Sequence, residues 1–172
     1  MADQYPEGIS ERHKSGDSNQ HVIWWRVGLI ALVLVVALFG LLGGAPAPTS
    51  QATGAAATLA VTTPDRLRNG MLFETRISAQ AKRPIEDAVI AVPSAMWRDM
   101  TVNSMIPAPA EEENVGGEFR FHFGPLDPGE TLTLKIDGQV NPPRYSGTSG
   151  RIRLLDGEAE LAALPLSLKV IP

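Results

Sequence analysis

The sequence predicts an all-β domain, an antiparallel β-sandwich, preceded by one transmembrane α-helix. From Val27 to Ala45 the chain carries no charged, amide or proline side chain. This run of roughly 19 residues is close to the ~20 that a helix needs to cross the hydrocarbon core of a bilayer. After it, short apolar runs are separated by many of the 14 prolines and 16 glycines of the 172-residue chain. That punctuation is typical of all-β domains.

These observations divide the chain into four segments. We expect a disordered cytoplasmic tail over residues 1–21, a transmembrane helix over 22–44, a Pro/Ala-rich linker over 45–56 and an extracytoplasmic domain over 57–172. The tail is polar and has too few apolar residues to form a core. The linker spans on the order of 20 Å as a flexible coil, so the domain is expected close to the outer membrane surface.

The composition excludes several classes of function. The chain has no cysteine, which excludes a disulfide framework, a thiol nucleophile and any cysteine-ligated metal site. The formal net charge is −4, and acidic and basic residues alternate in the domain without forming a basic stripe. We therefore expect no nucleic-acid partner.

The apolar segment has two interpretations, a retained signal anchor or a cleaved signal peptide. A signal peptide has a core of about 7–15 apolar residues, and this run is longer, with about 26 residues before it. The small residues Gly43, Gly44 and Ala45 resemble a cleavage site, but Pro46 follows directly. We favour a retained anchor, with the lipid bilayer as its partner.

Charge asymmetry predicts the orientation. Arg12, Lys14 and Arg26 precede the apolar run, and the next basic residue is Arg66. Positive residues stay on the cytoplasmic side, so we expect a single-pass protein of the cytoplasmic (inner) membrane with its N-terminus inside and its domain periplasmic or extracellular. Trp24 and Trp25 would lie in the aromatic belt at the cytoplasmic interface.

Small residues near the end of the segment suggest a helix–helix contact. Gly40 and Gly44 are spaced as a small-xxx-small pair, and Ala37 lies about one turn earlier. The alternative is a flexible exit from the bilayer, because glycine is common at the ends of membrane helices.

The domain shows the alternation of half-buried strands. Met71, Phe73, Ile77 and Ala79 fall on one face of a strand whose other face is polar. The same pattern recurs in three later runs, with inward residues Phe119, Phe121 and Phe123, then Leu132, Leu134 and Ile136, then Leu164, Leu166, Leu168 and Val170. Residues 100–105 are expected to form an edge strand and residues 107–113 an exposed loop, and Asp156-Gly157 predicts a hairpin turn. Turn signals every ~8–12 residues indicate an immunoglobulin-like sandwich.

One part of this pattern resembles a known family. The apolar strand from Val89 to Pro93 is followed by a loop, by Phe121 and Phe123, and by the turn Gly124-Pro125-Leu126-Asp127-Pro128-Gly129. This order resembles the immunoglobulin-like repeat domains of bacterial envelope and surface proteins, present here as a single copy. The resemblance implies an adhesive, spacer or docking module and supplies no catalytic residues.

No constellation for catalysis is visible, so we expect a protein that is not an enzyme and has no cofactor. His122 is the only histidine of the domain and is predicted on the solvent face of its strand, and no serine lies in a Gly-x-Ser-x-Gly elbow. Glu111, Glu112 and Glu113 fit a solvated loop or weak calcium binding. The methionines of residues 96–105 fit either core packing or a Cu(I) site.

The segment after Pro93 is the candidate interface. It contains Met96, Trp97, Met100, Met105 and Ile106, residue types that are frequent where proteins bind one another. The alternative is packing of Trp97 on the domain's own edge. We expect a membrane-anchored, non-catalytic module that docks another membrane or envelope protein. A ligand- or metal-binding carrier or sensor is the alternative.

Overall fold

The computed structural model describes residues 20–41, 45–142 and 146–171. The chain divides into two compact units, residues 1–42 and 43–172, which are described separately. Most of the predicted cytoplasmic tail lies outside the described residues, as does Gly44.

In the first unit, residues 20–41 are described and contain one helix, α1 (Gln20–Leu38). Its segment His21–Leu38 has a mean hydropathy of 2.2. The helix has 19 residues and is therefore about 28 Å long, close to the ~30 Å of a hydrocarbon core. By length and composition it can cross a membrane.

The helix ends earlier than the sequence suggested, because Gly40 caps it. Gly40 has a φ of +68°, a left-handed conformation that glycine adopts without steric cost. Its N–H donates to the carbonyl of Ala37 at 2.9 Å, and the N–H of Leu41 donates to the carbonyl of Val36 at 3.3 Å. This pair of bonds is a Schellman cap. Gly40 therefore lies beyond the helix, and the helix–helix contact through Ala37, Gly40 and Gly44 stays a prediction.

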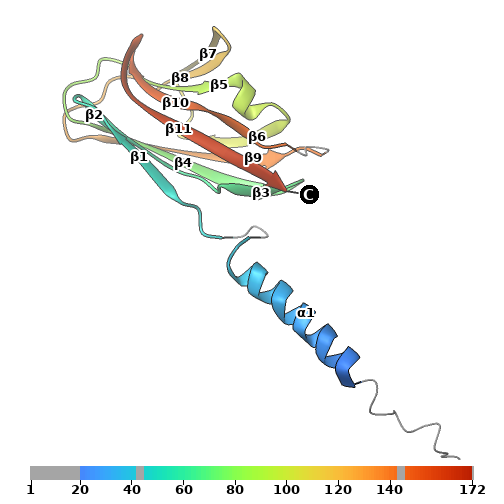
Figure 1. The fold of residues 1–172 in the computed structure, drawn as a ribbon. Helices are drawn as coiled ribbons and strands as arrows, with labels where there is room; N and C mark the ends of the chain where they lie inside the picture. Colours follow the sequence, from blue (N-terminus) through green and yellow to red (C-terminus); the bar gives the residue numbers. More distant parts are fainter. Residues whose placement is uncertain (1–19, 42–44, 143–145, 172) are drawn as a thin grey trace, which may run out of the picture. The chain divides into compact units, whose positions relative to one another are not determined.

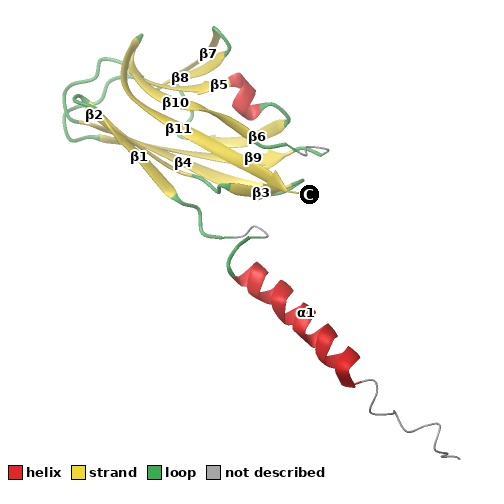
Figure 2. Cartoon of the chain, in the orientation of Figure 1, coloured by secondary structure: helices red, strands yellow, loops and turns green. Residues whose placement is uncertain are grey.

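The second unit is an immunoglobulin-like sandwich of two sheets, which confirms the predicted fold class (Figures 1 and 2). The five-stranded sheet has the order β1-β2-β4-β9-β6 and the six-stranded sheet the order β3-β11-β10-β5-β8-β7. All pairings are antiparallel except that of β3 with β11. The strands are β1 (Thr49–Thr53), β2 (Ala57–Thr62), β3 (Arg66–Arg68), β4 (Leu72–Ala81), β5 (Ala88–Pro93), β6 (Met100–Ile106), β7 (Glu111–Val115), β8 (Glu118–His122), β9 (Thr131–Val140), β10 (Thr148–Asp156) and β11 (Ala159–Ile171).

The core lies between the sheets and follows the alternation of the strands. Ile77 and Ala79 of β4 are buried with Leu134 of β9, their neighbour in the sheet. From the other sheet, Ile90 of β5 and Leu154 of β10 face them in the same apolar cluster. The predicted hairpin turn at Asp156-Gly157 joins β10 to β11, with Gly157 at a φ of +55°.

A second, smaller apolar cluster lies on the outer face of the six-stranded sheet. It consists of Val89, Ala91 and Leu155. Cross-strand neighbours point to the same face, and Ala91 lies between Arg120 and Arg153. The aliphatic parts of such long side chains can cover an apolar strip while their charged ends reach water. Strand β5 is therefore buried on both faces.

Two segments that the sequence assigned to irregular structure are strands. Residues 45–56 were expected to be a linker, but β1 pairs along its full length with β2. Residues 107–113 were expected to be an exposed loop, but β7 begins at Glu111 and pairs with β8. Strand β7 forms because the chain reverses at Gly116 and Gly117, whose φ values of +61° and +83° are those of a tight two-residue hairpin.

Candidate functional site

A groove opens along one side of the sandwich, beside strands that end their sheets. Strand β6 is the last strand of the five-stranded sheet and β7 the last of the six-stranded sheet. The groove has a volume of about 400 Å³. It is lined by Trp97, by Val102, Asn103, Ser104 and Met105 of β6, by Glu112 of β7, and by Phe119 and Phe121 of β8.

Three stacked aromatic rings form much of the groove lining. Trp97 ends the short 3-10 turn η3 (Ser94–Trp97), and Phe119 and Phe121 lie two residues apart on one face of β8. The ring centroid of Trp97 is 5.8 Å from that of Phe119 and 5.7 Å from that of Phe121. Each such pair contributes about 0.5–1.5 kcal/mol beyond simple burial. The turn after Pro93 is therefore held against β8 by its tryptophan.

The five predicted interface residues have different environments. Met96 is buried in the core, and Met100 packs against the core. Trp97 and Met105 are partly buried and line the groove. Ile106, at the end of β6, is 60% exposed. The structure thus brings Trp97 and Met105 together at one groove, whereas Met96 is a core residue. Ile106 pairs with Lys135 on the outer face of the five-stranded sheet and does not line the groove.

Trp97 also satisfies the alternative that the sequence left open. It stacks on the domain's own phenylalanines and still lines the groove. Its packing gives the groove a rigid aromatic wall. Whether a partner binds there is an untested prediction.

Sequence reasoning missed the contribution of Glu112. In the register of the sheet, Glu112 pairs with Phe121, which in turn pairs with Ile90. Directly paired residues point to the same face, so Glu112 lies on the inner face, whereas Glu111 and Glu113 lie on the outer face. The Gly-Gly turn followed by an alternating aromatic strand is the signal that could have revealed this hairpin.

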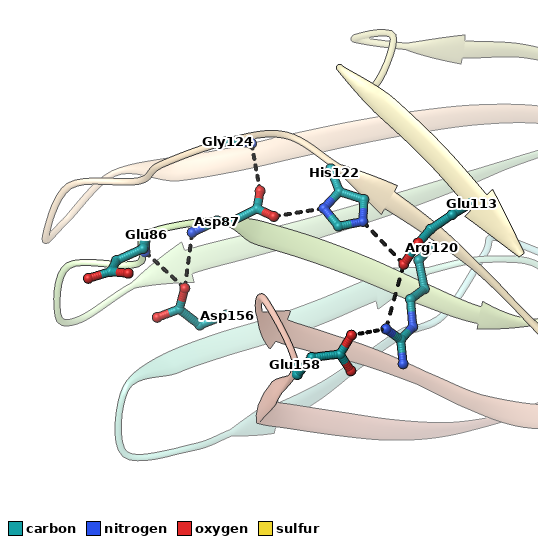
Figure 3. A network of polar contacts seen from close by, with 8 residues as sticks. All are labelled: Glu86, Asp87, Glu113, Arg120, His122, Gly124, Asp156 and Glu158. Atoms are coloured by element: carbon teal, nitrogen blue, oxygen red, sulfur yellow. Dashed lines mark hydrogen bonds and ion pairs between the residues drawn. The ribbon is translucent and has the colours of Figure 1, made fainter. Parts of the chain in front are cut away.

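A polar network occupies the outer face of the same sheet (Figure 3). Nδ1 of His122 lies 2.7 Å from Oδ2 of Asp87, and Nε2 lies 3.5 Å from Oε1 of Glu113. Oδ1 of Asp87 accepts the N–H of Gly124 at 3.2 Å. His122 therefore links the edge strand β7 to the residue that precedes β5.

Arg120 extends the network toward the β10–β11 hairpin. Its Nη1 lies 2.6 Å from Oε1 of Glu158 and 3.6 Å from Oε1 of Glu113. At the other end, Oδ1 of Asp156 accepts the backbone N–H groups of Glu86 and Asp87 at 2.9 and 3.0 Å (Figure 3). The network connects the residues before β5, the β7–β8 hairpin and the β10–β11 hairpin.

The carboxylates favour the charged form of His122. Its pKa is raised above the ordinary value, first because of the hydrogen bond with Asp87 and then because of the charges of Asp87 and Glu113, while desolvation acts in the opposite direction. The hydrogen bond with Glu158 similarly raises the pKa of Arg120. His122 lies on the outer face of its sheet, as the alternation of the strand predicts, but its side chain is only 21% exposed and is bonded to carboxylates.

This arrangement is suited to holding strands together. Among the described residues, the side-chain partners of His122 are the carboxylates of Asp87 and Glu113, and no hydroxyl nucleophile is among them. Within residues 20–41, 45–142 and 146–171, no three His, Asp or Glu side chains are grouped so that they could hold a metal ion. The metal-carrier alternative remains an untested expectation.

Comparison with known proteins adds little. No family model matches the chain, and no curated protein matches it. Among solved structures, one similar chain is the CARDB domain of a Pyrococcus furiosus protein in complex with di-metal ions, at 14% sequence identity and a TM-score of 0.42, covering 71% of this chain and 95% of that domain. Similarity at this level carries no argument about function.

Proposed function

We propose that this chain is a non-enzymatic, single-pass membrane protein of the cell envelope whose sandwich docks another membrane or envelope protein through the groove between β6 and β7. The observation that carries the proposal is the groove itself. It combines an aromatic wall with an exposed aliphatic residue, Val102, on an edge strand. Aromatic residues in preformed pockets are the usual anchors of protein interfaces.

The apolar helix supports the membrane part of the proposal. The helix contains no acidic residue and one Lys or Arg residue, Arg26. Most of its large apolar side chains are exposed in this structure. Exposed apolar surface of this extent is unfavourable in water and favourable in a bilayer. The charge asymmetry around the segment favours an external domain.

The edge position of the groove supports the docking part. Val102 of β6 lines the groove and is 39% exposed, so an aliphatic side chain meets solvent beside the aromatic wall. A partner that covers it would bury apolar surface and add to its contacts inside the groove. The short segment between the helix and β1 favours a partner that lies at the same membrane surface.

Site-specific photocrosslinking in native membranes tests the proposal. A photoreactive residue at Val102 is expected to trap one defined partner. Leu72 is the matched control, because it is an exposed aliphatic residue (64%) on β4, outside the groove. Equal capture at Leu72 and Val102, or only random neighbours at both, would contradict docking through the groove.

A further inference from the structure

We infer that the groove binds a cationic side chain, arginine or lysine, carried on an extended segment of the partner protein. This inference rests on the proposed docking function and specifies the chemistry of what is docked. Three features of the groove carry it: an uncompensated carboxylate, aromatic faces, and a strand edge that resists continuous pairing.

Glu112 supplies the carboxylate. It lies on the same face of its sheet as Phe121 and lines the groove with an exposed side chain. Within the described part of the chain, the carboxylate of Glu112 has neither a hydrogen bond nor an ion pair. The carboxylate of its neighbour Glu113, in contrast, lies close to Arg120 and His122. The charge of Glu112 is therefore available to a ligand.

The aromatic wall favours the same kind of occupant. A guanidinium or ammonium group placed over the face of Trp97 or Phe119, which are only partly buried, is attracted by the ring quadrupole, most strongly by tryptophan. Arginine can in addition form two parallel hydrogen bonds with one carboxylate. An apolar side chain in this position would cover Glu112 without compensating its charge, which is unfavourable.

The other polar residues of the lining, Asn103 and Ser104, are uncharged. The hydroxyl of Ser104 already donates to Oδ2 of Asp137 at 2.6 Å. Among the described residues that line the groove, Glu112 is the only charged one. An anionic occupant would meet this carboxylate without a cation to offset the repulsion.

The edges of the two sheets disfavour an added strand. The register of β6 with β9 shifts at Asn103, between Val102 and Ser104, and such bulges interrupt pairing along an edge. Strand β7 has three consecutive glutamates, so two copies paired through β7 would bring carboxylates together. The geometry favours insertion of a side chain from a different, basic segment.

A peptide-display selection tests the inference. The full chain, held in lipid nanodiscs, is presented with a library of random nonapeptides. Enriched peptides are expected to contain arginine or lysine flanked by apolar residues. For one such peptide, Glu112→Gln should weaken binding at least tenfold. The matched control, Glu86→Gln, removes an exposed carboxylate outside the groove and should leave the affinity unchanged.

Several outcomes would overturn the inference. These are the absence of any enriched peptide, enrichment of peptides without a basic residue, and equal binding by Glu112→Gln and the parent chain. Unchanged circular dichroism of the variant shows that a loss of binding is not a loss of fold. A product of twice the chain's mass in the crosslinking experiment would identify a second copy as the partner and overturn the assignment to a different protein.

The two proposals fail in different ways. If a defined partner is trapped at Val102 but selected peptides show no preference for cations, docking stands and the cationic ligand is wrong. If cationic peptides bind through Glu112 but no partner is trapped in membranes, the chemistry of the groove stands and the docking function is wrong.

Discussion

Replacing Trp97 by alanine removes the ring that holds the turn after Pro93 against β8. The ring of Trp97 is stacked on that of Phe119 and tilted against that of Phe121, at centroid distances of 5.8 and 5.7 Å. Two such pairs contribute together about 1–3 kcal/mol. A fully buried aromatic residue costs about 3–5 kcal/mol when it is truncated to alanine. Trp97 is only partly buried, so we expect a loss of about 2–3 kcal/mol in the free energy of unfolding.

Urea denaturation of the full chain in mild detergent, followed by circular dichroism of the β signal, measures this loss. For a unit of this size, the same loss of unfolding free energy corresponds to a fall in melting temperature of about 6–15 °C. Two variants make the comparison sharp. Trp97→Phe retains a ring and should lose less stability than Trp97→Ala. Ile106→Ala truncates a side chain that is 60% exposed and should change stability by less than about 0.5 kcal/mol.

The combination of stability and binding then separates the two roles of Trp97. If the tryptophan both packs and binds, Trp97→Phe should lower partner capture more than its small loss of stability explains. A change of less than about 0.5 kcal/mol on Trp97→Ala would refute the claim that this ring organises the groove.

Two further predictions concern the outer face and the β1 edge. The folded state raises the pKa of His122 and therefore favours its protonated form. The stabilisation of the fold by protonated His122 is complete below the ordinary pKa of about 6.5. It is lost as the pH rises through the higher pKa of the folded state. Denaturation midpoints measured between pH 6 and 8 should therefore fall more steeply with pH in the parent than in His122→Gln, and equal slopes would contradict the network. A Cβ at Gly54 would lie 2.1 Å from the carbonyl oxygen of Leu161, whereas one at Gly28 would meet nothing within 4 Å. Gly54→Ala should cost about 1–3 kcal/mol in thermal unfolding of the β unit and Gly28→Ala nothing; an unchanged Gly54→Ala would show that β1 is not packed beside β11.

The sandwich could be predicted from the sequence because its inward residues alternate. Strand β4 and the β10–β11 hairpin have apolar residues at every second position, and Asp156-Gly157 marks the turn between the hairpin strands. Strand β1 gave no such signal. Its sequence TSQAT has no large apolar residue, and it is held by backbone pairing with β2 and by the hydroxyl contact of Thr49 with Thr62 at 2.7 Å. An edge strand stabilised in this way has no hydrophobic period to detect.

The candidate site was predictable in part, for a similar reason. Trp97 and Met105 were identified by residue type, which is a local property. The role of Glu112 depends on the register of β7 against β8, and a shift by one residue would place it on the opposite face. The bond between His122 and Asp87 joins residues that are 35 positions apart, and no spacing in the sequence encodes such a pair. Glycine at position 40 was recognised as small, but its function as a helix cap depends on a positive φ.

The measurement that tests the account most directly is thiol labelling from outside intact cells. The chain has no cysteine, so a single introduced thiol gives an unambiguous signal. If the chain is a single-pass membrane protein with its β unit outside, Glu86→Cys, in the β unit, reacts with a membrane-impermeant maleimide, and Ser10→Cys reacts only after permeabilisation. Both variants then remain in the membrane after alkaline extraction. Labelling of Ser10→Cys alone in intact cells, or a shortened chain released into the soluble fraction, would contradict this account.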